Sequence, residues 1–380
     1  MVRLLTAYTF EADEFEVALA EILEQLDIEN NCLNNSAAFL FCHPDFISTG
    51  VAQGIAAALP FEVAGATTVC NLTQGLRDLT GLTVSVMTSD TVEFTAASLS
   101  CCNTAEDVVR IYKKVAEGRD GVPSLIFPLA SSVLSGDLAV TVLNELTDGQ
   151  TPLFGSNVIE NNANVSQSNA LHNGLSIHDG LVLIVAWGEL NAKFFVSEID
   201  EKSIQEHHAV ITKSNGHIIM SINDLCPAYY LESIGISDEQ ANGNLKAVPF
   251  VINLRDGTKP VVRAIFGLTP EGYIIASGAV SENATISVGS LNEDDVARIT
   301  DKTIENALSS GKSKGMLFFP CVSHFWMMES SPFEIIQNKI DCVVPYQVFY
   351  SGGEICPVYD STGKLHNRYH SFTCIACSFE

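Results

Sequence analysis

Three short apolar segments decide the fold of this chain: Ala37-Ala-Phe-Leu-Phe-Cys42, Ser124-Leu-Ile-Phe127 and Gly315-Met-Leu-Phe-Phe-Pro320. Unbroken apolar runs of this length are typical of central strands that helices cover on both faces. Each run follows a strand and a helical pattern, and each precedes a second helical pattern and two further strands. One β-α-β-α-β-β unit therefore recurs three times. The units cover residues 2–87, 92–187 and 284–379.

A region of different pattern separates the second unit from the third, which we expect to begin with a strand at Ala284–Leu291. Residues 209–280 contain alternating polar and apolar runs and turn signals such as Asn215-Gly216, which predict a mostly antiparallel insert. The fold class is therefore α/β, with repeated units that form layered sheets covered by helices, and with this insert. We divide the chain into a domain of residues 1–200, with two units, and a domain of residues 201–380.

The charge balance limits the partners that this chain can bind. Lysine and arginine number 20, and aspartate and glutamate number 45, which gives a net charge of −25. A surface this negative repels nucleic acid and anionic lipid, because both are bound through lysine and arginine. Hydrophobic residues make up 47% of the chain, which excludes an intrinsically disordered protein. We therefore expect no nucleic-acid partner, no membrane insertion, and cationic or zwitterionic partners.

The sequence predicts a cytoplasmic protein with reduced cysteines. No apolar stretch approaches the roughly 18 residues that a membrane span needs, and the N-terminus lacks the apolar core of a signal peptide. The cysteine count of 11 is odd, and several cysteines, such as Cys42 and Cys374, lie within apolar strand-like runs. In a chain without an export signal, this pattern indicates buried thiols rather than a disulfide framework.

Polar residues follow the two inner strands of the third unit. Cys321 and His324 come after the strand that ends at Pro320, and Gly352-Gly353-Glu354 follow the strand that ends at Ser351. Two strands of one sheet that a helix connects run parallel, so these residues should meet at one edge. Ligands of open α/β sheets bind at the carboxyl ends of strands. The sequence therefore predicts a binding pocket at this edge.

The segment Leu365-His366-Asn367 stands shortly before the last strand, Ser371–Phe379. If that strand is antiparallel to its neighbour, His366 and Asn367 reach the same edge. The second unit has a similar arrangement, with Gly155-Ser-Asn157 and Leu171-His172-Asn173. The paired glycines of the third unit would let the backbone approach a ligand and expose its N–H groups.

Each of these residues also has a purely structural interpretation. Cys321 fits a small buried apolar residue, and His324 fits a packed histidine. Gly352-Gly353 fits a turn, and His366 with Asn367 fits a cap. The sequence contains no Gly-x-Gly-x-x-Gly, P-loop, Gly-x-Ser-x-Gly or His-Glu-x-x-His motif. Convergence at one edge is therefore the argument for a pocket.

Several motifs resemble the FIST family, which is named for F-box and intracellular signal transduction proteins. The first half resembles the N-terminal FIST module through Ala64-Gly-Ala-Thr-Thr68. The second half resembles the C-terminal module at five segments: His217–Tyr230, Val262–Gly267, Phe318–Cys321, Tyr350–Ile355 and Leu365–Asn367. The resemblance spans nearly the whole chain.

The resemblance implies a cytoplasmic sensory module that binds a small ligand, such as an amino acid, and reports to a separate signalling protein. Eight residues fall on motif positions of the family: Arg263, Cys321, Tyr350, Gly352, Gly353, Glu354, His366 and Asn367. The family typically has an arginine shortly after the cysteine, where this chain has His324. A histidine cannot clamp a carboxylate as an arginine does, so the chemistry of the ligand stays open.

The leading hypothesis is a non-catalytic sensor. Glu354 would bind a cationic group of the ligand, while His366, Asn367 and glycine N–H groups would bind polar or anionic groups. No metal and no other cofactor is expected in this interpretation.

Two alternatives stay open. The first is a thiol-dependent hydrolase or transferase, with Cys321 as nucleophile, His366 or His324 as base and Glu354 as the orienting carboxylate. The second is a haem sensor, because some FIST proteins are associated with haem. Its axial ligand would be His366, His370 or a cysteine.

Overall fold

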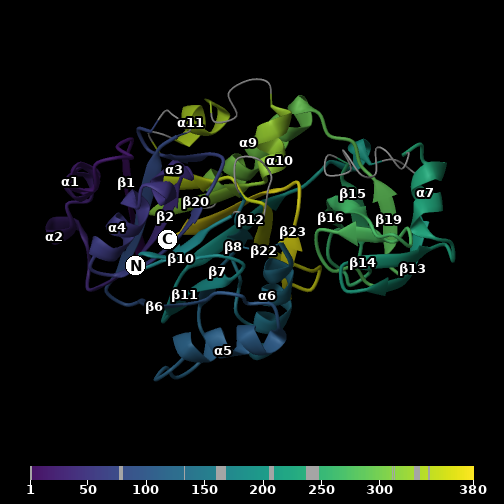
Figure 1. The fold of residues 1–380 in the computed structure, drawn as a ribbon, viewed down its shortest axis with the longest axis horizontal. Helices are drawn as coiled ribbons and strands as arrows, with labels where there is room; N and C mark the ends of the chain where they lie inside the picture. Colours follow the sequence, from purple (N-terminus) through teal and green to yellow (C-terminus); the bar gives the residue numbers. More distant parts are fainter. Residues whose placement is uncertain are drawn as a thin grey trace.

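The computed structural model describes most of the chain. It covers residues 2–76, 80–131, 133–159, 168–204, 209–236, 248–309, 311, 313–328, 334–340 and 343–380. In these residues the fold is mixed α/β, has more strand than helix, and contains four sheets. Three sheets form the main body, and the fourth lies beside it (Figure 1).

Each sheet of the main body contains the central strands of one sequence unit. The first sheet has the order β1 (Val2–Thr9), β5 (Leu82–Ser89), β2 (Asn35–Cys42), β3 (Glu62–Thr67), β9 (Ala170–His172) and β10 (Leu175–Ile177). The second has the order β23 (Leu365–His370), β22 (Gly353–Tyr359), β8 (Gly155–Asn157), β7 (Leu125–Ala130), β11 (Leu181–Trp187) and β6 (Glu93–Leu99). The third has the order β12 (Ala192–Ser197), β24 (Cys374–Phe379), β20 (Gly315–Pro320), β21 (Tyr346–Phe349) and β4 (Asn71–Thr73).

The three sheets share one arrangement of four strands: β1-β5-β2-β3, β6-β11-β7-β8 and β12-β24-β20-β21. In each set the second strand is antiparallel to the first and to the third. The third and fourth strands run parallel. The expected parallel pairing of the two inner strands of the third unit is confirmed, because β20 pairs with β21 with Met316 opposite Tyr346. The carboxyl ends of β20 and β21 therefore lie at one edge.

The prediction that the third unit begins at Ala284–Leu291 is wrong. A strand does occur there, β19 (Thr285–Val288), but it pairs with β13 (Ala209–Asn215) and β15 (Phe250–Asn253) in the sheet of the insert. The place beside β24 is taken by β12, which precedes the insert in the sequence. The apolar pattern predicts that a strand forms, but it does not specify which sheet the strand joins.

Each sheet of the main body is completed by strands from another unit. β4, from the first unit, pairs with β21, and β9, from the second unit, pairs with β3. β22, from the third unit, pairs with β8 and carries β23 with it. The three units thus exchange strands in a cycle, which joins the three sheets into one body.

Helices cover the outer faces of the three sheets (Figure 1). They comprise α1 (Phe15–Leu26), α2 (Ile28–Asn31), α3 (Asp45–Ser48) and α4 (Val51–Ala58) in the first unit, α5 (Ala105–Val115) and α6 (Val133–Leu146) in the second, and α9 (Glu293–Ser309), α10 (Val322–Met327) and α11 (Glu334–Ile340) in the third. α5 begins at a capping box, in which the Thr104 side chain accepts from Asp107 N–H and the Asp107 carboxylate accepts from Thr104 N–H. Among the described residues, no helix has the length and apolar character of a membrane span.

The inner faces of the three sheets meet in a core of phenylalanine side chains. The Phe39 and Phe127 rings, 5.1 Å apart, join the first sheet to the second, and Phe41 and Phe349, 4.2 Å apart, join the first to the third. Phe154, next to β8, lies 4.8 Å from Phe319 of the third sheet. Each pair of sheets therefore shares an aromatic contact, which adds packing specificity to the apolar burial.

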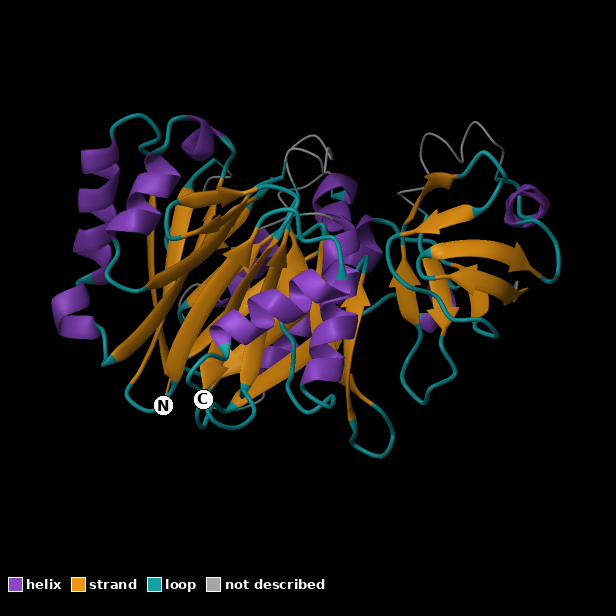
Figure 2. Cartoon of the chain, turned by 60° about the horizontal axis from the view of Figure 1, so that its bottom comes forward, coloured by secondary structure: helices purple, strands orange, loops and turns teal. Residues whose placement is uncertain are grey.

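The insert forms a seven-stranded sheet with its own apolar core. Its order is β16 (Val261–Arg263), β15, β19, β13, β14 (Ile218–Ile222), β18 (Ile274–Ala276) and β17 (Ile265–Leu268), and α7 (Pro227–Ser233) packs on β14. Every strand pair in it is antiparallel, as the alternating pattern predicted. Figure 2 shows this sheet beside the main body, apart from the three larger sheets.

Candidate functional site

The carboxyl ends of β20 and β21 meet at a polar edge. Cys321 pairs with Ser351 as an isolated parallel bridge, and Val322 N–H donates to Ser351 C=O over 2.8 Å. Cys321 N–H donates to the carbonyl of Thr373, which stands just before β24. We call this group of residues, together with Glu354 and His324, the Glu354 edge.

Glu354 lies at the centre of this edge with no exposed surface. One carboxyl oxygen accepts from the Ser351 hydroxyl at 2.7 Å. The other accepts from the Thr373 hydroxyl at 2.8 Å and from Thr373 N–H at 3.3 Å. The carboxyl thus fastens the start of β22 to the end of β21 and the start of β24. All of these donors are neutral.

No ion pair joins Glu354 to a lysine, arginine or histidine in the described part of the chain. Burial raises its pKa to about 8, although the hydrogen bonds from Ser351 and Thr373 act in the opposite direction. Near neutral pH, Glu354 therefore carries a proton in most molecules. An ionised Glu354 would need a positive charge beside it, because unpaired buried charge is costly.

The Cys321 side chain is 6% exposed, and its sulfur accepts from the Ser323 hydroxyl at 3.1 Å. Burial raises the pKa of this thiol well above its ordinary value, and the nearby Glu354 raises it further. The thiolate is the reactive form of cysteine. These features do not support a role for Cys321 as a nucleophile.

His324 is buried at the start of α10, and its Nε2 lies 3.1 Å from the Phe372 carbonyl. Since a carbonyl only accepts, Nε2 must carry the proton. Nδ1 is buried and has no hydrogen-bond partner among the described residues. Burial lowers the pKa of His324 to about 4, so the ring is neutral and Nδ1 is an acceptor.

The paired glycines allow a close approach, but the approaching group is the Tyr369 side chain. A Cβ on Gly353 would overlap the Tyr369 phenol oxygen. Asn157 donates to that phenol oxygen at 3.1 Å, and Gly352 N–H donates to the Asn157 carbonyl at 2.9 Å. Gly353 N–H donates to Ser351 Oγ at 3.2 Å. The expectation that these N–H groups face a ligand is wrong, because both donate within the protein.

The ends of the third strands of all three units meet at the same place. Thr68, which follows β3, donates to the Tyr350 carbonyl at 2.8 Å, and Tyr350 itself is 2% exposed. Asn157, at the end of β8, accepts from Gly352 N–H, as described above. Thr67 N–H donates to the Asn169 carbonyl at 2.9 Å. The Glu354 edge therefore lies beside strand ends of both other units.

Arg263 comes from the insert but reaches the main body. Its guanidinium is buried and donates to the Tyr369 carbonyl at 2.7 Å and to the Ala279 carbonyl at 3.3 Å. It also lies 5.9 Å from the centre of the Tyr369 ring. Since Tyr369 contacts Gly353, Arg263 is linked to the Glu354 edge through one side chain.

His366 and Asn367 do not reach the Glu354 edge. The expectation that they stand at the start of the last strand is wrong, because they lie in β23, in a different sheet from β24. Glu354 pairs with His370, whereas His366 pairs with Val358, four residues further along β22. Four residues of strand span roughly 13 Å.

The side chains of this segment have structural partners. Asn367 Oδ1 accepts from Leu153 N–H at 2.8 Å, and its Nδ2 donates to the Thr151 carbonyl at 2.8 Å. His366 lies 3.0 Å from Asp360. His370, the other histidine considered for haem, has no exposed surface, and its Nε2 donates to the Cys356 carbonyl at 3.2 Å. Within the described ranges, no group of histidine, cysteine and acidic residues could hold a metal ion.

Sequence reasoning missed Ser351, Thr373, Tyr369 and Asn157 as parts of this edge. Ser351 is the last residue of one predicted strand and Thr373 lies near the start of another, so strand ends alone could have identified them. Tyr369 and Asn157 come together only through the exchange of β22 and β23 into the second sheet. No local pattern in the sequence signals that exchange.

The sequence matches two family models. Residues 36–225 match the FIST N domain, and residues 228–357 match the FIST C domain. The two matches cover most of the chain, and the chain belongs to the FIST family. FIST domains are sensory modules of signal transduction that are associated with small ligands.

Other comparisons add little. No curated protein matches the sequence. Among solved structures, the crystal structure of cyanuric acid hydrolase from A. caulinodans is 10% identical, over 50% of this chain and 71% of that chain, with a TM-score of 0.27. At that TM-score, the similarity supports no conclusion about this chain.

Proposed function

We propose that this chain is a cytoplasmic sensor of an amino-acid-like metabolite, which binds at the Glu354 edge through its ammonium group and signals through a separate protein. One observation carries the proposal. A fully buried carboxyl stands where strand ends of three units meet, and no ion pair from the described residues compensates it. A ligand ammonium would supply the positive charge that an ionised Glu354 needs.

The polarity of the edge favours a ligand that donates hydrogen bonds. Glu354 offers carboxyl oxygens, and His324 offers an unpartnered Nδ1 acceptor. The N–H groups of Gly352 and Gly353 are already used within the protein. An ammonium, which only donates, suits such a surface better than a carboxylate does.

Binding at this edge requires a movement of the chain. Glu354 has no exposed surface, so a ligand reaches it only when the surrounding strands and loops open. A ligand that binds an open form better than a closed form shifts the balance between them. Such a shift is what a sensor passes to its signalling partner.

A thermal-shift panel tests the proposal. It compares amino acids with their decarboxylated amines, which keep the ammonium, and with their N-acetyl derivatives, which lack it. A ligand that binds the folded chain raises its melting temperature. We expect stabilisation by one group of ammonium compounds, none by the matching N-acetyl compounds, and loss of the effect in Glu354→Gln.

Glu24→Gln is the matched control, because Glu24 is an exposed carboxylate on α1. It should respond to ligands like the unchanged chain. The proposal is wrong if no ammonium compound stabilises the chain, or if the N-acetyl compounds act equally well. It is also wrong if folded Glu354→Gln responds as strongly as the Glu24→Gln control.

A further inference from the structure

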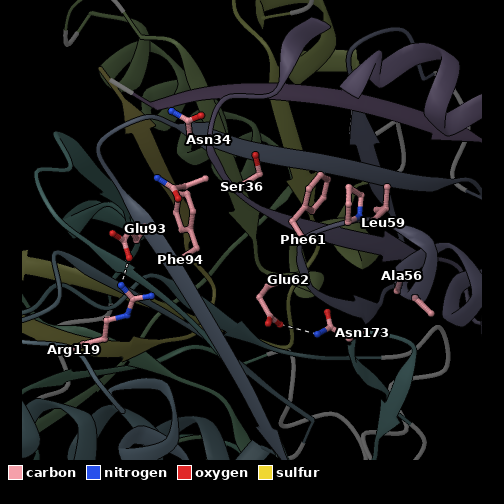
Figure 3. A pocket seen from close by; sticks show the side chains of 13 residues that line it. Asn34, Ser36, Ala56, Leu59, Phe61, Glu62, Glu93, Phe94, Arg119 and Asn173 are labelled. Carbon is pink, nitrogen blue, oxygen red and sulfur yellow. Dashed lines mark hydrogen bonds and ion pairs between the residues drawn. The ribbon is translucent and has the colours of Figure 1, made fainter. Parts of the chain in front are cut away.

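An open cleft lies between the first and second units, on the opposite side of the sheets from the Glu354 edge. Its volume is about 510 Å³, which falls within the usual range for small-ligand sites. It is bordered by the starts of β2, β3 and β6 and by the loop after α5 (Figure 3). Its lining includes Asn35, Phe61, Glu62, Glu93, Phe94 and Arg119.

Glu62 presents a fixed carboxylate to this cleft. Its Oε2 accepts from Asn173 Nδ2 at 2.7 Å and lies 3.1 Å from His172 Nε2. His172 is held in turn by Ser98, whose hydroxyl lies 3.0 Å from Nδ1. Oε1 of Glu62 has no hydrogen-bond donor among the residues that the structure describes. One oxygen is therefore anchored, and the other remains available to a ligand.

The positive charge in the cleft is already neutralised. Arg119 forms an ion pair with Glu93 on the opposite wall from Asn173 (Figure 3). The Glu93 side chain is 52% exposed, so this pair is a surface pair, which contributes little stability. Among the ionisable residues that line the cleft, the negative charge of Glu62 is therefore not compensated. This charge makes the cleft attractive to cations.

Two aromatic rings flank the approach to Glu62. Phe61 and Phe94 are both half-buried and line the cleft, with Ser36 between them in Figure 3. Aromatic faces attract guanidinium and ammonium groups and cover the carbon chains that carry them. Asn35 adds an amide group that can donate to or accept from a polar ligand.

We propose that this cleft is a second binding site, which takes a guanidinium or alkylammonium group carried on a carbon chain. The cation would bind Glu62 Oε1, and its carbon chain would lie between Phe61 and Phe94. The group could belong to a free amine or to a basic side chain of a signalling partner. Both sources offer the same chemistry, and the high negative charge of the chain favours either one.

Calorimetric titration of the full chain tests the proposal with two pairs of probes. The first pair is butylguanidine and butylurea, and the second is acetyl-Gly-Arg-Gly-amide and the same peptide with citrulline. We expect the guanidinium probe of at least one pair to bind about tenfold more tightly than its neutral analogue, as a charge-assisted contact predicts. Tighter binding of butylguanidine indicates a free small molecule, and tighter binding of the peptide indicates a partner segment.

Two substitutions should change the affinity in opposite directions. Glu62→Gln should weaken guanidinium binding about tenfold, because it removes the charge that binds the ligand. Arg119→Ala should strengthen it about threefold, because Glu93 is released from its ion pair. Glu24→Gln should leave it unchanged, because Glu24 is an exposed carboxylate on α1 that does not line the cleft.

The proposal is overturned if neither guanidinium probe binds, or if neutral and charged probes bind alike. It is also overturned if Arg119→Ala weakens binding, since loss of a positive charge from the cleft should favour a bound cation. If Glu62→Gln fails to fold, Glu93→Gln decides. The Glu93→Gln variant leaves Arg119 without its partner carboxylate, so it should weaken guanidinium binding. Unchanged or stronger binding in this variant would contradict the proposal.

Discussion

Glu354 and Glu62 show how differently one fold can treat the same side chain. Glu354 is fully buried among neutral donors, and burial raises its pKa to about 8. The Glu62 side chain is 38% exposed, and its hydrogen bond with His172 lowers its pKa below the ordinary value. Glu354 is therefore a proton-linked group, whereas Glu62 is a constant negative charge near neutral pH. Because of this difference, pH should affect binding at the two proposed sites in different ways.

The largest expected effect is the pH dependence that Glu354 gives to stability. The unfolded carboxyl ionises above its ordinary pKa of 4.5, while the folded one stays protonated up to about 8. Stability should therefore fall as pH rises through this window, by on the order of 4 kcal/mol in total, and level off above it. Glu354→Gln should make this fall smaller. The measurement is urea unfolding at about pH 5, 7 and 9.

Glu62→Gln serves as the contrast in the same experiment. The folded pKa of Glu62 is lowered, so its contribution to stability is present above the unfolded pKa and is lost as the pH falls below it. Its pH profile between about 5 and 9 should match that of the unchanged chain. If both variants flatten the profile equally, the two carboxyls do not differ as described.

Substitution of Gly353 should damage the Glu354 edge and spare the cleft. A Cβ at Gly353 overlaps the Tyr369 phenol oxygen, so Gly353→Ala should reduce the free energy of unfolding by about 3 kcal/mol. At Gly352 the nearest atom to an added Cβ is Ile159 Cβ at 3.0 Å, so Gly352→Ala should cost less. Equal losses in chemical denaturation would show that Tyr369 is not the group that requires glycine.

These residues also show how far the sequence predicts the structure. The apolar runs correctly placed the central strands, and the parallel connection correctly brought Cys321 next to the segment that contains Glu354. Both inferences depend on local pattern and on a general rule of chain connection. Physical reasoning from the sequence was therefore sufficient to bring these two segments together.

The remaining parts depend on long-range pairing that no local pattern specifies. Asn173 accepts from Val63 N–H, and Asn367 accepts from Leu153 N–H, both at 2.8 Å. The two Leu-His-Asn segments thus fasten exchanged strands to a neighbouring sheet. The sequence showed that the motif recurs, but its structural role became visible only with the exchange.

Thiol reactivity should distinguish the buried edge from the surface. Cys321 is buried and its pKa is raised, whereas Cys101 is exposed. At about pH 8, iodoacetamide should modify Cys101 at least about 100-fold faster than Cys321, as followed by mass spectrometry of the digested protein. Comparable rates would reopen the interpretation of Cys321 as a nucleophile.

The smallest expected effect concerns the Thr373 hydroxyl. Thr373→Val removes the hydroxyl that donates to Glu354 and keeps the shape of the side chain. It should lower the free energy of unfolding by about 1 kcal/mol and raise the pKa of Glu354 further, because one stabilising donor of the charged form is lost. Thr141→Val is the control, since Thr141 is an exposed residue of α6. Similar effects in both variants would exclude a specific role for Thr373.

Titration of the Glu354 carboxyl carbon by ¹³C NMR tests the central claim most directly, with Glu354→Gln used to assign the signal. The proposal predicts a midpoint near pH 8 without added compound. It also predicts a clear downward shift of that midpoint when the stabilising ammonium compound from the panel is added, and no shift with its N-acetyl derivative. A midpoint near 4.5, or one that no ammonium compound changes, would contradict the account.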